Sequence, residues 1–266
     1  MTAIRNPLEL YKLLPKSNCG QCYLPSCLAF AAAVLKGEKG LDDCPHLPPD
    51  SVARHGGGVD RRPSWDDNLQ EQLAALRRQV AAVDFAEAAG RLGADLHDGK
   101  LLVRCLGKTF LVDRQGNVAS ECHTHAGLTI PLLSYIVHSK GGAPAGRWVP
   151  FRELEGGAPM SALFARRGEQ NLRKLADSDP ELFATLVTSF SARHAATPFT
   201  ARVTVVLEPL PLLPVLLAYW PAEDDLESDL NIFFDAAADR HLPIDNIFSL
   251  AVGMVMMFEK IAKRHG

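Results

Sequence analysis

The chain has 266 residues, of which 47% are hydrophobic and 22% charged, and its formal net charge is −3. These values are those of an ordinary folded protein, long enough for one large domain and one small one. The weak net charge argues against nucleic acid or an acidic membrane as the partner. No apolar run reaches the ~18–20 residues that span a bilayer, and the N-terminus lacks the apolar core of a secretory signal. We therefore expect a cytoplasmic protein without a membrane span.

Four of the six cysteines lie within the first 44 residues, at Cys19, Cys22, Cys27 and Cys44. Cytosolic thiols stay reduced, so clustered cysteines indicate a metal site more often than disulfides. Four thiolates are the ligand set of an iron–sulfur cluster, and also that of a structural zinc ion. Structural zinc sites usually contain two tight C-x2-C pairs, whereas this C-x2-C-x4-C-x16-C series contains one. The spacing therefore favours a cluster over zinc or simple buried thiols.

The residues between these cysteines predict how the four sulfurs come together. Gly20 tolerates the backbone angles of a tight turn inside the C-x2-C pair. Cys27 begins a run of helix formers that ends at Gly37, and exposed N–H groups stabilise a thiolate in the first turn of a helix. Cys44 follows that helix, and Pro45 stops regular structure behind it. The sulfurs are expected to come from a turn, a helix start and a returning loop.

Composition divides the chain into three parts. Residues 1–50 hold the cysteine series and end in the proline-rich segment C-P-H-L-P-P-D. Residues 51–64 contain three consecutive glycines, several charges and a proline, which is typical of a linker. Residues 65–266 are expected to form one domain that binds a partner or a cofactor.

Within that domain, apolar residues at helical spacing begin after Ser64, a candidate N-cap, and continue to Gly93 with an expected break. Two short apolar runs and the turn-prone R-Q-G-N then predict a β-meander. The remaining pattern predicts helices at 130–139, 161–176, 180–190 and 246–263, and strands at 101–105, 109–112, 202–207, 213–219 and 231–235. This order favours an α+β fold, in which helices pack against a mostly antiparallel sheet behind a small N-terminal module.

The segment E-C-H-T-H at residues 121–125 is the other place rich in metal ligands. Cys122, His123 and His125 have donor atoms suited to a metal or to the axial position of a haem or corrinoid. Cys105 is a further candidate ligand from the meander. If the segment is a strand, His123 and His125 share one face. The alternative is a loop with two exposed imidazoles and a half-buried thiol.

Two further segments carry charges or aromatic rings without a recognised motif. The acidic stretch 222–229 is interpreted as a loop between strands, with docking of a basic partner as the alternative. In residues 146–157, Arg147 and Arg152 are candidates for anion binding, whereas Trp148 and Phe151 are interpreted as core side chains. The chain has no nucleotide fingerprint, nucleophile elbow, zinc-protease motif or haem attachment motif, so no catalytic residue is identified.

The N-C-G-Q-C opening, the cysteine spacing, the apolar helix and the C-P ending resemble a four-cysteine [4Fe-4S] domain. That domain occurs in the large subunit of the corrinoid iron–sulfur protein and in the B subunit of the Rnf electron-transport complex. The resemblance covers roughly residues 7–50 and implies that Cys19, Cys22, Cys27 and Cys44 ligate one cubane cluster.

The following part of the chain resembles an uncharacterised domain found behind such clusters in anaerobic bacteria. The matching segments are R-C-L-G-K-T-F-L-V-D-R-Q-G, G-R-W-V-P-F-R-E-L-E-G-G and I-F-F-D-A-A-A-D-R-H-L-P. This second resemblance implies no particular chemistry. A corrinoid-binding barrel is not recognisable in the sequence.

These features predict an iron–sulfur redox protein that transfers electrons, or reductively activates a partner, in anaerobic and corrinoid-linked metabolism. It is expected to be an accessory protein more than a catalyst, with a corrinoid protein or another low-potential enzyme as its partner. The alternative is a two-centre protein whose large domain binds a haem or corrinoid through His123 or His125. A third hypothesis is a sensor or assembly module whose cluster serves only structure.

Overall fold

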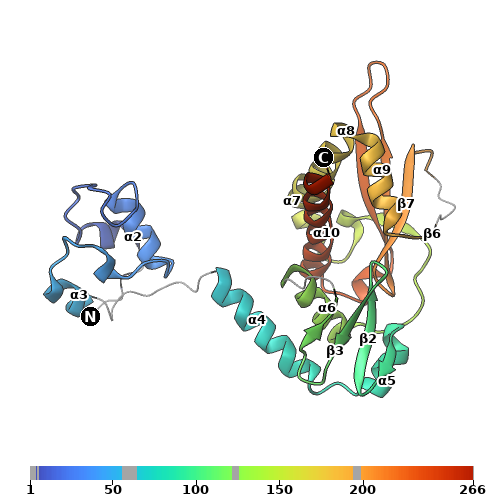
Figure 1. Cartoon of the computed structure of the whole chain (residues 1–266), viewed down its shortest axis with the longest axis horizontal. Helices are drawn as coiled ribbons and strands as arrows, with labels where there is room; N and C mark the ends of the chain where they lie inside the picture. Colours follow the sequence, from blue (N-terminus) through green and yellow to red (C-terminus); the bar gives the residue numbers. More distant parts are fainter. Residues whose placement is uncertain (1–3, 5, 56–64, 122–125, 194–198, 266) are drawn as a thin grey trace. The chain divides into compact units, whose positions relative to one another are not determined.

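The computed structural model describes residues 4, 6–55, 65–121, 126–193 and 199–265 (Figure 1). Contacts divide the chain into an N-terminal unit, Met1–Gln72, and a C-terminal unit, Leu73–Gly266. The structure is 49% helical and 19% strand, with antiparallel pairing throughout the described strands. The predicted α+β class is confirmed. None of the described helices is long and apolar enough to cross a membrane.

The N-terminal unit is built from short helices around a small apolar core. Its helices are α1 (Pro7–Tyr11), α2 (Cys27–Leu35), the 3-10 turn η1 (Leu41–Asp43) and α3 (Pro49–His55). The core residues are Leu10, Leu14, Cys27, Phe30, Ala31, Val34, Leu35, Leu41, Cys44 and Leu47. Residues 51–55 of the predicted linker belong to α3, and residues 56–64, including the candidate cap Ser64, lie outside the described residues.

Two helices and a small sheet begin the rest of the chain. The predicted break in the first helix falls between α4 (Trp65–Val80) and α5 (Phe85–Leu92), where Asp84 accepts a hydrogen bond from the Ala86 N–H at 2.9 Å. Gly93 ends α5 with a φ of 61°, a conformation that glycine adopts without strain.

The predicted meander is a four-stranded antiparallel sheet. Its order is β1 (Asp95–His97), β2 (Lys100–Cys105), β3 (Lys108–Val112) and β4 (Val118–Ala119). Positive φ angles at Asp98–Gly99 and Leu106–Gly107 allow the two tight hairpin turns. The Leu106 N–H donates to the Glu208 carbonyl at 2.9 Å, which ties this sheet to the larger one.

The larger sheet has the order β5-β9-β8-β7-β6. Its strands are β5 (Trp148–Pro150), β6 (Ser191–Arg193), β7 (Val203–Leu210), β8 (Leu213–Trp220) and β9 (Asp229–Asp235). The central strand β8 is buried from Leu213 to Tyr219, and its Leu217 is paired with Val205 and Ile232. The three long predicted strands are confirmed.

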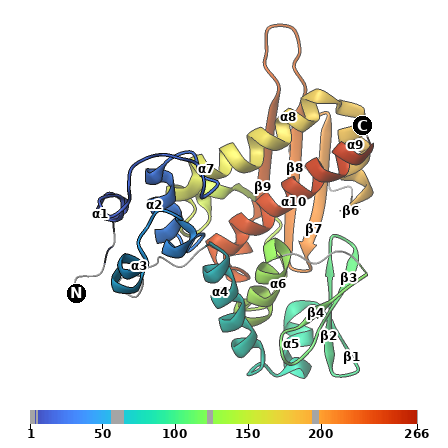
Figure 2. The same cartoon turned by 60° about the vertical axis from the view of Figure 1, so that its left-hand side comes forward.

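Helices cover this sheet, and Figure 2 shows α8 and α10 crossing in front of β7, β8 and β9. The helices are α6 (Ala126–His138), α7 (Ser161–Phe164), α8 (Gln170–Ser178), α9 (Pro180–Ser189) and α10 (Ile244–His265), with short 3-10 turns at Phe151–Glu153, Ala158–Met160 and Ala238–Arg240. The single helix predicted over 161–176 is wrong in detail, because a π-turn at Ala165–Glu169 interrupts it. This turn lets the Glu169 carboxylate accept the Ile232 N–H at 3.2 Å.

The segment 146–157 is held by burial and hydrogen bonds. Phe151 is buried and stacks on Phe164 with ring centroids 4.3 Å apart, as expected of a core side chain. Nearby, the buried Asp235 carboxylate accepts the N–H groups of Ala145, Gly146 and Ala237 at 2.7, 2.7 and 2.9 Å. These bonds fasten the loop before β5 to the end of β9.

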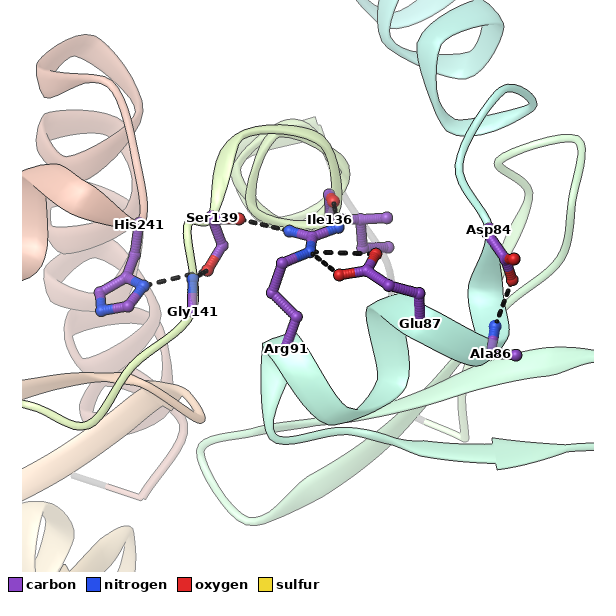
Figure 3. A network of polar contacts seen from close by, with 8 residues as sticks. All are labelled: Asp84, Ala86, Glu87, Arg91, Ile136, Ser139, Gly141 and His241. Carbon is purple, nitrogen blue, oxygen red and sulfur yellow. Dashed lines mark hydrogen bonds and ion pairs between the residues drawn. The ribbon is translucent and has the colours of Figure 1, made fainter.

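A polar network joins the end of α6 to its neighbours (Figure 3). Arg91 of α5 donates to the carbonyl groups of Ser139 and Ile136 and pairs with Glu87 at 3.1 Å. The Ser139 hydroxyl lies 3.0 Å from Nδ1 of His241, a buried side chain. Three separate segments therefore meet at the C-terminal end of α6.

Candidate metal centre

The four N-terminal cysteines line one pocket in the N-terminal unit. The pocket contains about 300 Å³ of space between atoms, which includes open solvent. Cys27 and Cys44 are each 8% exposed and belong to the apolar core, whereas Cys22 is half-buried and Cys19 is exposed. The set of four thiols thus has an apolar, buried side at Cys27 and Cys44 and a solvent-exposed side at Cys19.

The backbone of the first cysteine loop has an unusual conformation. Positive φ angles recur at Lys16 (60°), Asn18 (49°), Gly20 (73°) and Tyr23 (63°). Such angles are uncommon outside glycine, and for a bulky residue such as tyrosine they are strained. Loops of this kind turn successive N–H groups toward a common centre, and several iron–sulfur sites use them to hold an anion.

Hydrogen bonds in this loop favour the thiolate of Cys19. The pKa of the Cys19 thiol is lowered, first by the backbone N–H of Gln21 and next by the Ser17 hydroxyl. Burial acts in the opposite direction and does not overcome these donors. Because the thiolate is the form of cysteine that binds metals, this lowered pKa is compatible with the candidate ligand role of Cys19.

Cys27 is positioned by the start of α2. The Ser26 hydroxyl caps this helix by accepting the Ala29 N–H at 3.1 Å. The Cys27 N–H, which has no partner inside its own helix, donates to the Asn18 side-chain oxygen at 2.8 Å. The turn and the helix start predicted from the sequence are therefore joined by a direct hydrogen bond.

Cys44 directly follows the turn η1, in the loop that was predicted to return after α2. The Gly40 N–H donates to the Asp43 carboxylate at 2.8 Å, and the Cys44 N–H donates to the Leu41 carbonyl at 3.3 Å. Leu41 is buried in the same core as Cys44. This turn holds the fourth thiol against the apolar side of the pocket.

The chemistry of the donor set fits an iron–sulfur cluster. The side chains around the pocket that can ligate a metal are the four cysteines, and no charged residue lines it. In the described part of the chain, no group of three or more His, Cys, Asp or Glu side chains is arranged to hold a single metal ion.

The second predicted ligand group is only partly described. Cys122, His123 and His125 lie outside the described residues. Cys105 ends β2 as a buried free thiol, and burial raises its pKa to about 12. The unbound Cys105 side chain is therefore a neutral core group near neutral pH. Arg147 and Arg152 are both exposed; Arg147 directly follows the loop that Asp235 holds, and Arg152 lies in the 3-10 turn Phe151–Glu153. In the acidic stretch, residues 222–227 are exposed between β8 and β9, Ser228 is buried, and Asp229 begins β9.

Sequence reasoning missed Ser17, Asn18 and Ser26, the polar residues that hydrogen-bond to Cys19, to Cys27 and to the first turn of α2. Two of them carried a signal, because a serine directly before a helix start is a preferred cap and asparagine accepts left-handed backbone angles. The contact of Asn18 with a residue nine positions later carried none.

Comparison with known families agrees with this arrangement. The family model described as "Domain of unknown function (DUF3786)" matches residues 84–257, and the model described as "Putative Fe-S cluster" matches residues 14–46. The predicted order, an iron–sulfur region followed by an uncharacterised domain, is confirmed. The match supports an iron–sulfur cofactor in the N-terminal unit. No solved structure matches the chain.

Three curated relatives share parts of the sequence. The corrinoid/iron-sulfur protein large subunit of Moorella thermoacetica is 55% identical over 40 residues, which cover 15% of this chain and 9% of the relative. The acetyl-CoA decarbonylase/synthase complex subunit gamma 1 of Methanosarcina thermophila is 48% identical over 93 residues, or 35% of this chain and 18% of the relative. The gamma subunit of Methanosarcina acetivorans is 28% identical over 172 residues, or 59% of this chain and 34% of the relative. The chain therefore spans about a third or less of these relatives.

Proposed function

The chain belongs to the DUF3786 family, and we propose that it is a [4Fe-4S] protein that transfers electrons to a partner, or reductively activates it, in anaerobic metabolism. The observation that carries the proposal is that Cys19, Cys22, Cys27 and Cys44 line one pocket. Four thiolates are the usual ligand set of such a cluster, which when bound would supply a one-electron couple. Such a couple suits an electron-transfer or accessory protein more than a catalyst.

The surroundings of the ligands suit electron transfer. Cys27 and Cys44 pack in the core, so apolar side chains exclude water from that side of the pocket. On the other side Cys19 is exposed, and Tyr23 in the same loop exposes 91% of its surface. Solvent access and hydrogen bonds to sulfur are two means by which proteins set a cluster potential. A partner would approach the loop at residues 16–23.

The relatives suggest what kind of partner this is. Their names place them in a corrinoid/iron–sulfur protein and in acetyl-CoA decarbonylase/synthase complexes. We propose a corrinoid protein or another low-potential enzyme as the redox partner, with the C-terminal unit recognising it. The protein would work in the cytoplasm and bind neither nucleic acid nor membrane.

Anaerobic purification of the full chain tests the cofactor directly. The expected result is about four iron atoms and about four sulfides per chain, with an electron paramagnetic resonance signal that appears on reduction. Zinc without sulfide would overturn the cluster assignment. A cluster that resists reduction at all accessible potentials would overturn electron transfer and favour a structural role.

A second cofactor in the C-terminal unit is a separate proposal. His123 or His125 would supply an axial ligand to a haem or corrinoid, since imidazole serves this role in many haem proteins. The optical spectrum of anaerobically purified protein tests it, because a Soret or corrinoid band that is lost in His123→Ala or His125→Ala would support it. A wild-type spectrum with cluster absorption alone would overturn it.

A further inference from the structure

We infer that Asn18 is a positioning residue, which locks the C-x2-C loop onto the first turn of α2 and so sets the spacing of the thiols before a cluster binds. The inference rests on the proposed function, because it assigns a role toward the cluster that the four cysteines would hold. Asn18 also lines the pocket that contains these cysteines.

The geometry of Asn18 links two otherwise separate parts of the ligand set. Its side-chain oxygen accepts the Cys27 N–H at 2.8 Å across nine residues of sequence. Its own backbone has a φ of 49°, and its chain neighbour is Cys19. Asn18 therefore fixes Cys19, its chain neighbour, through the backbone, and it fixes the start of α2 through its side chain. Movement of the loop away from α2 would break this bond.

Asparagine suits this position for two physical reasons. It tolerates left-handed backbone angles better than other residues with a side chain, because its short polar group bonds locally. Its carboxamide is also neutral, so it accepts the Cys27 N–H without adding negative charge beside the thiolates. Aspartate would accept the same bond but would repel the additional electron of a reduced cluster.

Three substitutions separate these contributions in the full chain. Asn18→Gly retains the left-handed backbone angle but removes the side-chain hydrogen bond. Asn18→Ala removes this bond and also disfavours the backbone angle. Asn18→Asp retains the bond and the angle but adds a negative charge. Asn6→Ala is the matched control, because Asn6 caps α1 by accepting the Leu8 N–H at 2.9 Å and does not line the pocket. Each protein is purified anaerobically and reconstituted with ferrous iron and sulfide. Iron release to a chelator, reduction potential and thermal midpoint are then measured.

We expect Asn18→Ala to release iron about tenfold faster than wild type, as removal of groups that orient metal ligands commonly does. Asn18→Gly should release iron at a rate between those of wild type and Asn18→Ala. Asn18→Asp should release iron near the wild-type rate, and its cluster should have a lower reduction potential. Asn6→Ala should lower the thermal midpoint and leave the release rate and the potential unchanged.

Three results would overturn the inference or its premise. Asn18→Ala and Asn18→Gly with wild-type release rates would overturn the positioning role and leave the cluster proposal standing. An equal acceleration in Asn6→Ala would show that iron release follows the general stability of the N-terminal unit, which also overturns it. Wild-type protein that binds no iron and sulfide would instead overturn the proposed function.

Discussion

The Nδ1 atom of His241 lies 3.0 Å from the hydroxyl of Ser139, so a buried imidazole fastens the end of α6 to the turn before α10. The other ring nitrogen, Nε2, is buried without a hydrogen-bond partner among the described residues. Burial lowers the pKa of His241, and Arg240 adds to this effect, while Asp235 and Asp239 oppose it. The folded protein therefore favours the neutral ring.

This arrangement predicts that acid destabilises the C-terminal unit. The unfolded histidine has a pKa near 6.5, above that of folded His241, so on acidification the unfolded state binds the proton first. The stabilisation is present above about pH 6.5 and is lost as the pH falls toward the lower folded value. Urea unfolding of wild type and His241→Gln should be measured above and below this pH. The free energy of unfolding should fall less on acidification in the variant than in wild type.

The exposed His138 provides the control for that comparison. His138→Gln should keep the wild-type difference between the two pH values, because its ring is not transferred from water on folding. An unchanged pH dependence in His241→Gln would contradict the assignment.

The buried Asp235 carboxylate should be a major contributor to the stability of the C-terminal unit. Asp235→Asn leaves one acceptor oxygen and places an amide N–H₂ against backbone donors, so we expect a loss of about 2–3 kcal/mol in the free energy of unfolding. Asp239→Asn is the matched variant, because the Asp239 carboxylate accepts one exposed N–H, from Glu155 at 3.1 Å. It should cost under about 1 kcal/mol. Chemical denaturation measures both, and equal losses would refute the role of Asp235.

Substitution of a proposed ligand should lower the iron content without unfolding the C-terminal unit. Cys44→Ala should lose most of its iron on anaerobic purification, while the thermal transition of the C-terminal unit persists, since its core lies in residues 73–266. Cys105→Ala should retain wild-type iron and destabilise the C-terminal unit by about 1 kcal/mol, because it removes a buried sulfur. Full iron content in Cys44→Ala would refute this ligand assignment.

The two kinds of cysteine should also differ in reactivity. In cluster-free protein, iodoacetamide should modify Cys19 before the other cysteines, because this thiol is exposed. The reaction should already occur below pH 9.0, the ordinary pKa of a thiol, because hydrogen bonds lower the pKa of Cys19. Cys105 should stay unmodified until the C-terminal unit unfolds, since burial raises its pKa to about 12. Peptide mass spectrometry across a pH series measures both rates. Ser17→Ala should slow the reaction at Cys19, and equal rates at Cys19 and Cys105 would contradict the prediction.

Long elements with a clear period were predictable from the sequence. The apolar run of β8 and the turn residues of the β2–β3 hairpin encode their own local structure. The strands β5 and β6 were not predictable, because three residues are too few to show a period. The π-turn before α8 was missed for another reason: its extra residue follows from packing against β9, including the Glu169 contact with Ile232.

The candidate site shows the same division. Which thiols are candidate ligands, and that a turn, a helix start and a loop carry them, was predictable from the sequence, because spacing, caps and turn residues act over a few positions. Three features follow from the folded chain instead: the four thiols line one pocket, Cys27 and Cys44 are buried while Cys19 is exposed, and Asn18 joins the turn to the helix. Burial and contacts between distant residues depend on how the core of Leu10, Phe30 and Leu41 packs, and local spacing does not encode that packing.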